Sequence, residues 1–126
     1  PRVLAILDWE LSTLGHPFSD LAYNCMPYHL PPDMPTVRGF GDADLQALKI
    51  PDERTYVAAY AGRSGRDPGP HWPFFMAFSL FRYAAIVQGV YARALQGNAS
   101  SADAAELGRM APRLAAIGWA LVESRA

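Results

Sequence analysis

The alternation of apolar and polar positions predicts one short strand near the start of the chain and helices in the rest of it. Residues 3–7 form a continuous apolar run that ends abruptly at Asp8, the pattern of a fully buried strand. From Pro17 the spacing becomes helical, and Pro is favoured as a first helical residue because its missing N–H would have no partner there. The apolar positions of this first helix are Phe18, Leu21, Ala22 and Cys25.

Prolines and glycines separate the first helix from the second. A group of prolines predicts that residues 26–42 form an extended loop. These are Pro27, Pro31, Pro32 and Pro35. Residues 44–48 have the length and composition of one helical turn, and Pro51 opens a longer helix that Gly62 and Gly65 are expected to end. The residues that share a face of that helix are Tyr56, Val57, Tyr60 and Ala61.

The later helices differ in how their apolar residues are arranged. Residues 72–96 predict a long helix that is apolar on nearly every side in its first half, so we expect that half to lie at the centre of the core. Its bulky residues are Phe74, Phe75, Phe78, Phe81 and Ile86. Ser100 or Ser101 can cap the next helix, which Pro112 must kink or split. That helix carries one apolar stripe, formed by Leu107, Met110, Leu114, Ile117 and Leu121.

The predicted strand has no predicted partner within the chain. A lone buried strand leaves backbone donors and acceptors unpaired on both edges, at a cost on the order of 1–3 kcal/mol for each group. We therefore expect the strand to pair with a segment outside this chain. The chain is then the C-terminal piece of a larger protein, or a second chain completes the sheet.

Composition and charge limit the classes of protein that fit. The 126 residues are 51% hydrophobic and 18% charged, which suits one folded domain and is too apolar for disorder. Eleven basic and twelve acidic residues give a net charge of −1, so no broad basic surface for nucleic acid or an anionic membrane is expected. The apolar tract 72–87 is short for a membrane span and contains Arg82. With a single cysteine and no visible signal peptide, we expect a cytoplasmic protein.

Three charged residues stand out from their surroundings. Asp8 ends the predicted strand, and a carboxylate at such a rigid position can face a cleft. More commonly, an acidic residue at the end of a strand only takes part in a turn or a cap. Asp20 falls in a first helical turn, where the helix dipole favours an acidic residue. Arg82 lies on an apolar helix, where an unpaired cation is costly to bury. It either extends its head group to water or pairs with Asp8, Glu10 or Asp20.

Two stretches of sequence resemble a known signature. Residues 7–10 (Leu-Asp-Trp-Glu) and 14–22 (Leu-Gly-His-Pro-Phe-Ser-Asp-Leu-Ala) resemble the second signature of the aminoglycoside phosphotransferase and choline kinase-like family, whose members share the protein-kinase fold. Residues 76–86 and 88–101 resemble the branch of that family found fused to, or encoded near, acyl-CoA dehydrogenases. The resemblance implies a mainly α fold, the C-terminal helical lobe of a kinase-like α+β protein. Residues 1–10 then supply the strand and metal-site turn, and residues 17–126 the helical substrate-side subdomain.

The resemblance also implies an activity and roles for particular residues. It implies transfer of the γ-phosphoryl group of ATP to a hydroxyl of a small molecule, with Mg²⁺ as the metal. Asp8 matches the metal-binding aspartate, and Glu10 is either a supporting group or a charge at the cleft rim. Asp20 matches the aspartate that braces the catalytic loop, whereas His16 stands where Asp is commoner and is expected to serve helix entry. The catalytic base belongs to an upstream motif, so the chain alone is expected to be inactive.

The acceptor and two rival hypotheses remain open at this stage. Aminoglycoside pockets tend to be acidic, and few acidic residues follow Glu53, so a hydroxyacyl thioester or another apolar alcohol fits better, with Trp72 and Phe75 lining its site. One rival is a relative that has lost catalysis. The other is a helical interaction module in which residues 74–86 mediate oligomerisation.

Overall fold

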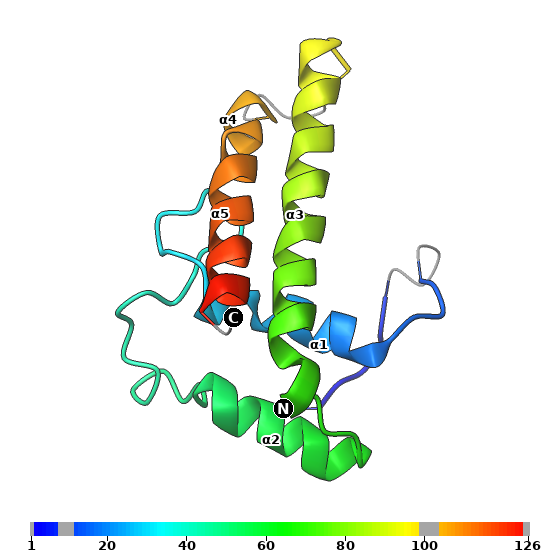
Figure 1. Cartoon of the computed structure of the whole chain (residues 1–126), viewed down its shortest axis with the longest axis vertical. Helices are drawn as coiled ribbons and strands as arrows, with labels where there is room; N and C mark the ends of the chain where they lie inside the picture. Colours follow the sequence, from blue (N-terminus) through cyan, green and yellow to red (C-terminus); the bar gives the residue numbers. More distant parts are fainter. Residues whose placement is uncertain (1, 8–11, 99–103, 125–126) are drawn as a thin grey trace.

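The computed structural model describes residues 2–7, 12–98 and 104–124, and within these ranges the chain is helical, without a strand. The elements are α1 (Pro17–Cys25), the 3₁₀ turn η2 (Met26–Tyr28), α2 (Glu53–Ser64), the 3₁₀ turn η3 (Gly69–His71), α3 (Trp72–Leu95), α4 (Ala104–Gly108) and α5 (Met110–Glu123). Figure 1 shows α3 and α5 side by side and antiparallel, with α1 and α2 across the end where α3 begins. The predicted mainly helical class is confirmed.

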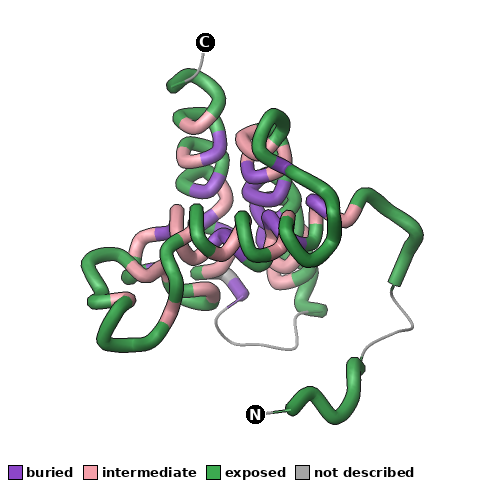
Figure 2. The backbone as a smooth tube through the Cα atoms, turned by 90° about the horizontal axis from the view of Figure 1, so that it is seen from below, coloured by how far each residue is buried: buried purple, intermediate pink, exposed green. Residues whose placement is uncertain are grey.

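Residues 2–7 do not form the predicted strand in this structure. They belong to no helix or strand, and Val3, Leu4 and Leu7 are largely exposed. Figure 2 shows the described part of this N-terminal stretch coloured as exposed. A strand exists only through the ladder of hydrogen bonds with a neighbour. Pairing of residues 3–7 with a segment outside this chain stays a prediction.

The core lies where α1, α3 and α5 meet. One face of α3 is buried, formed by Met76, Ser79, Leu80, Tyr83, Ala84 and Val87. It belongs to one hydrophobic cluster with residues of α1 and α5, among them Cys25 and Leu114. All four methionines of the chain are buried there, where their unbranched side chains fill irregular gaps.

The opposite face of α3 is exposed, which corrects the expectation for the first half of this helix. Phe74 and Phe81 are 65% and 66% exposed, and Phe78 and Ile86 are also exposed. The buried positions recur every three or four residues and so occupy a single face. Because the sequence is apolar on both faces, its pattern could not indicate which one packs.

The helix ends follow the capping chemistry of the sequence. Asp52 caps α2 by accepting a hydrogen bond from the Thr55 N–H (2.7 Å), and Gly65 ends it in the left-handed conformation. Gly62 lies inside α2, contrary to the prediction that it helps end the helix. The break between α4 and α5 falls at Arg109, and Pro112 sits in the first turn of α5, where its missing N–H costs no helical hydrogen bond. The proposed caps Ser100 and Ser101 lie outside the described residues.

The loop between η2 and α2 is fixed by close backbone contacts. The Gly39 N–H donates to the Pro31 carbonyl (3.0 Å), and a Cβ on Gly39 would lie 1.4 Å from the carbonyl oxygen of Leu30, so only glycine fits. Arg113 on α5 makes two hydrogen bonds of 2.9 Å to the Asp33 carboxylate of this loop. Residues 44–48 form the predicted single turn, closed by a bond from the Leu48 N–H to the Asp44 carbonyl (3.1 Å).

Gly69–Leu95 is long and apolar enough to cross a membrane, and an 18-residue window within it has a mean hydropathy of 1.3. Core helices of soluble proteins meet the same criterion, and here one face of α3 is buried against α1 and α5.

The buried face of α3 predicts a specific difference between two leucines on the same helix. Leu80 is fully buried and Leu95 is 71% exposed. Leu80→Ala leaves a cavity and should lower the free energy of unfolding by about 2–5 kcal/mol. Leu95→Ala should change it by no more than about 0.5 kcal/mol. Urea unfolding of both variants measures the difference, and equal effects would contradict the packing of α3.

Candidate functional site

The residues predicted to hold a metal lie where the structure gives no description. Asp8, its neighbour Trp9 and Glu10 fall outside the described residues. Within the described ranges, no group of three His, Cys, Asp or Glu side chains is placed to hold a metal ion. The roles of Asp8 and Glu10 therefore stay predictions. What the structure shows is the connection that follows them, the entry into α1.

His16 caps the start of α1, as its predicted role in helix entry requires. Its backbone is extended, and its Nδ1 accepts a hydrogen bond from the Phe18 N–H (3.3 Å). The imidazole also stacks on Phe75 of α3, with ring centroids 4.7 Å apart and an interplanar angle of 28°. The edge of Phe18 packs on the same ring at 4.7 Å. A side chain in this position joins the first turn of α1 to α3.

Asp20 is exposed in the first turn of α1. The structure therefore supports the favourable placement of an acidic residue near a helix N-terminus. A bracing role towards a catalytic loop stays a prediction.

Arg82 points to solvent and lies over an aromatic ring. Its guanidinium carbon is 5.1 Å from the centroid of Tyr23, and the residue is exposed. Burial raises the pKa of Tyr23, Tyr83 adds to the rise, and the Arg82 cation opposes it. Two alternatives were predicted for Arg82, a head group in water or an ion pair with an acidic residue. In the described part of the chain its head group is exposed to water. Pairing with Asp8 or Glu10 involves residues that are not described.

Trp72 and Phe75, predicted to line one substrate site, lie in different surroundings. Phe75 packs on His16 and Phe18 at the entry of α1. The Trp72 Nε1–H donates to Glu53 Oε1 (3.1 Å), and His29 Nε2 donates to the same oxygen at 2.7 Å. We call this arrangement of His29, Glu53 and Trp72 the polar junction, because it ties together η2, α2 and α3.

Two pockets are lined by residues of the polar junction, and both include Glu53 and Trp72. The larger, of about 380 Å³, is lined by Glu53, Arg54, Val57, Ala58, Asp67, Gly69 and Trp72. The smaller, of about 130 Å³, is lined by His29, Glu53, Trp72, Pro73, Met76, Leu121 and Ser124. The larger pocket combines an indole with side chains of both charges, so it can receive a ligand that has apolar and polar parts.

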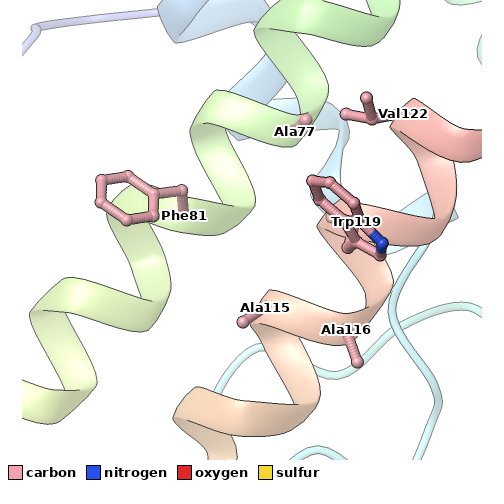
Figure 3. A pocket seen from close by; sticks show the side chains of 7 residues that line it. Ala77, Phe81, Ala115, Ala116, Trp119 and Val122 are labelled. Carbon is pink, nitrogen blue, oxygen red and sulfur yellow. The ribbon is translucent and has the colours of Figure 1, made fainter.

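A third pocket, of about 520 Å³, lies between α3 and α5 and is almost entirely apolar. Figure 3 shows residues of both helices that line it, Ala77 and Phe81 on α3 and Trp119 and Val122 on α5. Trp119 is 63% exposed, so this surface is open to solvent. Nothing polar in its lining indicates chemistry.

The polar junction was missed by sequence reasoning. His29 is 24 residues from Glu53, and Trp72 is 19 residues from it, so no local spacing links them. Glu53 itself falls in the first turn of α2, where its charge already has a local explanation. Only the packing of three helix ends brings the three side chains together.

The polar junction predicts that Glu53 stabilises the fold mainly as a hydrogen-bond acceptor. Glu53→Ala removes the acceptor of both Trp72 and His29 and should lower the free energy of unfolding by about 1–3 kcal/mol. Glu53→Gln keeps an accepting oxygen and should cost less than half as much. Urea unfolding compares the two, with Glu123→Ala at the exposed end of α5 as the control. An equal loss in Gln and Ala would show that the charge, rather than the acceptor, matters.

Cys25 predicts a pH dependence of stability. Burial, with a smaller contribution from Glu53, raises the pKa of the thiol from 9.0 to about 12. The unfolded chain then loses the thiol proton more readily than the folded one, so this contribution is complete below about pH 9 and is lost as the pH rises towards 12. The urea midpoint should fall more between pH 8 and pH 10 in the wild type than in Cys25→Ala. A native thiol that reacts with a disulfide reagent at pH 8 as fast as the unfolded one would contradict this burial.

Comparison with known proteins gives a consistent set of relatives, although no family model matches the chain. Acyl-CoA dehydrogenase family member 10 of Mus musculus is 51% identical over 118 residues, which is 94% of this chain and 11% of that protein. Family member 11 of Homo sapiens is 40% identical over 121 residues, 95% of this chain and 15% of that protein. Probable acyl-CoA dehydrogenase IBR3 of Arabidopsis thaliana is 44% identical over 110 residues, covering 82% and 13%.

A solved structure resembles the chain in both sequence and fold. It is described as a "putative aminoglycoside phosphotransferase" from Ralstonia eutropha JMP134 and is 47% identical, with a TM-score of 0.86. The match covers 98% of this chain and 37% of that one, so the chain spans a minor part of each of these relatives. The resemblance stated from the sequence is confirmed: the chain is similar to aminoglycoside phosphotransferase-like proteins and to the acyl-CoA dehydrogenase members, and its fold resembles the C-terminal lobe of a kinase-like phosphotransferase.

Proposed function

We propose that this chain is the helical, acceptor-side lobe of an ATP-dependent phosphotransferase that acts on a hydroxyl of a small molecule. The observation that carries the proposal is the match to the Ralstonia structure, at 47% identity over 98% of this chain. Identity at that level, together with a TM-score of 0.86, supports more than a shared arrangement of helices. The catalytic base and most of the nucleotide site are then supplied by residues outside this chain, and the protein acts in the cytoplasm.

Mg²⁺ is the metal that the proposal requires, and the donor chemistry of the chain fits one part of its site. Mg²⁺ is usually held by one or two carboxylates together with phosphate oxygens, so a complete set of protein ligands is not needed. Asp8 supplies one carboxylate, and the described residues add no cluster that could hold the ion elsewhere. When bound, the ion neutralises charge on the phosphates. Asp20 braces the adjacent loop, and Glu10 supports the metal site or borders its cleft.

The acceptor that the lobe fits best is an apolar alcohol, such as a hydroxyacyl thioester, rather than a polycationic aminoglycoside. In the larger pocket at the polar junction, Glu53 already accepts hydrogen bonds from His29 and Trp72, and Asp67 accepts one from the Gly69 N–H (2.8 Å). Arg54 lines the same pocket and offsets their charge. The indole of Trp72 offers apolar surface there, in keeping with its predicted substrate-side role.

A second candidate is a non-catalytic helical interaction module, or a relative that has lost catalysis. The observation that favours a module is the exposed aromatic stripe on α3, formed by Phe74, Phe78 and Phe81. Phe74 and Phe78 stack with ring centroids 6.2 Å apart and so present a continuous apolar surface.

Binding of Mg²⁺-ATP to the full-length protein tests the proposed function. A ligand at 100 times its dissociation constant stabilises the folded state by about 2.7 kcal/mol, so the wild type should melt at a higher temperature with Mg²⁺-ATP than without it. Asp8→Asn should abolish the part of the shift that depends on Mg²⁺. Asp42→Asn, at an exposed loop position, is the matched control and should leave the shift unchanged.

The competing outcomes are distinct. A wild-type protein that shows no shift at millimolar nucleotide would contradict the proposal and favour the interaction module. A Mg²⁺-dependent shift that persists in Asp8→Asn would show that the protein binds nucleotide but that Asp8 is not a ligand of the metal. Once binding is established, phosphoryl transfer to hydroxyacyl thioesters and to aminoglycosides separates the two classes of acceptor.

A further inference from the structure

The entry of α1 is held by a side chain that contacts two different elements. His16 Nδ1 accepts the Phe18 N–H at 3.3 Å, and this bond fixes the first turn of α1. The ring stacks on Phe75 at 4.7 Å, and this contact fixes the same turn against α3. An asparagine or aspartate at this position could make the first contact but not the second. The imidazole therefore both caps α1 and packs against α3, a combination that Asn or Asp cannot provide.

His16 also marks the point where the N-terminal part of the chain joins the packed helices. Residues 12–16 are exposed and belong to no helix or strand, whereas Phe18, two positions after His16, is buried. The direction in which the chain leaves α1 is thus set by the backbone of His16, and its ring holds that backbone in place.

We infer that His16 is a positioning residue for the nucleotide-binding end of the lobe, and that Phe75 is its platform. The inference rests on the proposed function, in which residues N-terminal to His16 contribute to binding of Mg²⁺-nucleotide. A protein binds its ligand more tightly when the binding segment already adopts the binding-competent conformation in the free protein. Less free energy is then spent on ordering that segment when the ligand binds. Loosening the entry of α1 lowers the competent fraction and raises the dissociation constant by the same factor.

The contacts of Phe75 give it a role in this arrangement, and its predicted substrate-side role stays a prediction. Phe75 packs on His16, Phe18 and Phe74, and it does not line the pockets at the polar junction. Its loss should therefore weaken the binding of nucleotide in the same way as the loss of His16, and the two effects should overlap rather than multiply.

The test measures the dissociation constant of Mg²⁺-ADP for the full-length protein by calorimetry, well below the melting temperature. His16→Ala should raise it by up to about fivefold, the limit set by the free energy of one helix cap. His16→Asn restores a cap without a ring and should recover part of the affinity. Phe75→Leu should raise the constant, and the double variant should be weaker than the wild type by less than the product of the single effects. Leu95→Ala, exposed at the far end of the same helix, is the control and should leave the constant unchanged.

A second measurement separates this inference from the proposed function. Hydrogen exchange of the Phe18 amide, the donor to His16, should accelerate in His16→Ala but not in Leu95→Ala. A wild type that does not bind Mg²⁺-ADP would overturn the proposed function, and the positioning role would fall with it. A wild type that binds, with the same dissociation constant in His16→Ala and Phe75→Leu despite lower melting temperatures, would overturn the positioning role alone.

Discussion

Burial of one face of α3 is the interaction on which the rest of the structure depends. α1 and α5 contribute to the same hydrophobic core as this face, and Leu80 and Leu114 are fully buried there. α5 packs closely on α3 at Gly118, where a Cβ would lie at contact distance, 3.4 Å, from the Cβ of Leu80. Each apolar side chain buried in this way contributes roughly 1.5–3 kcal/mol, so the three-helix core sets the positions of all the ends that carry polar groups.

α2 is attached to this core less firmly. None of its residues is fully buried, although Tyr56, Val57 and Tyr60 are partly buried against the core, and polar contacts at its start add to these. Glu53 accepts from His29 and Trp72, and the Asn24 amide donates to the Tyr56 hydroxyl (2.7 Å). A hydrogen bond of this kind contributes about 0.5–1.5 kcal/mol, less than a buried side chain. The larger pocket at the polar junction therefore has one wall, α3, that belongs to the core and one, α2, that can shift at lower cost.

Much of the fold could be predicted from the sequence, because caps, prolines and helical spacing act locally. The start of α1 at Pro17, the end of α2 at Gly65 and the stripe that buries Met110 and Leu114 all follow from residues close together in the chain. The exposed face of α3 could not be predicted, since both faces are apolar and only the partner helices choose between them. The strand over residues 3–7 depends on a neighbour that the described chain does not contain.

The candidate site was predictable only where its chemistry is local. His16 and Pro17 form a helix entry that can be recognised from two adjacent residues, and the structure confirms it. The polar junction combines three residues from separate elements, and nothing in the sequence relates one to another. The contacts of Trp72 and Phe75 could not be predicted either. The two residues are three positions apart on one helix, but Phe75 contacts His16 at the start of α1 and Trp72 contacts Glu53 on α2.

The aromatic residues of α3 connect its exposed surface to the entry of α1. Phe74 stacks on exposed Phe78 and packs edge-on against Phe75 at 5.3 Å, and Phe75 carries the ring of His16. A partner that covers the exposed stripe would therefore contact Phe74, which packs on the ring that holds His16. The interaction-module hypothesis uses this surface directly, whereas the phosphotransferase hypothesis uses the polar junction and the residues before His16. Phe75 lies between the surface that one hypothesis uses and the helix entry that the other uses, and the presence of the apolar surface alone does not decide between them.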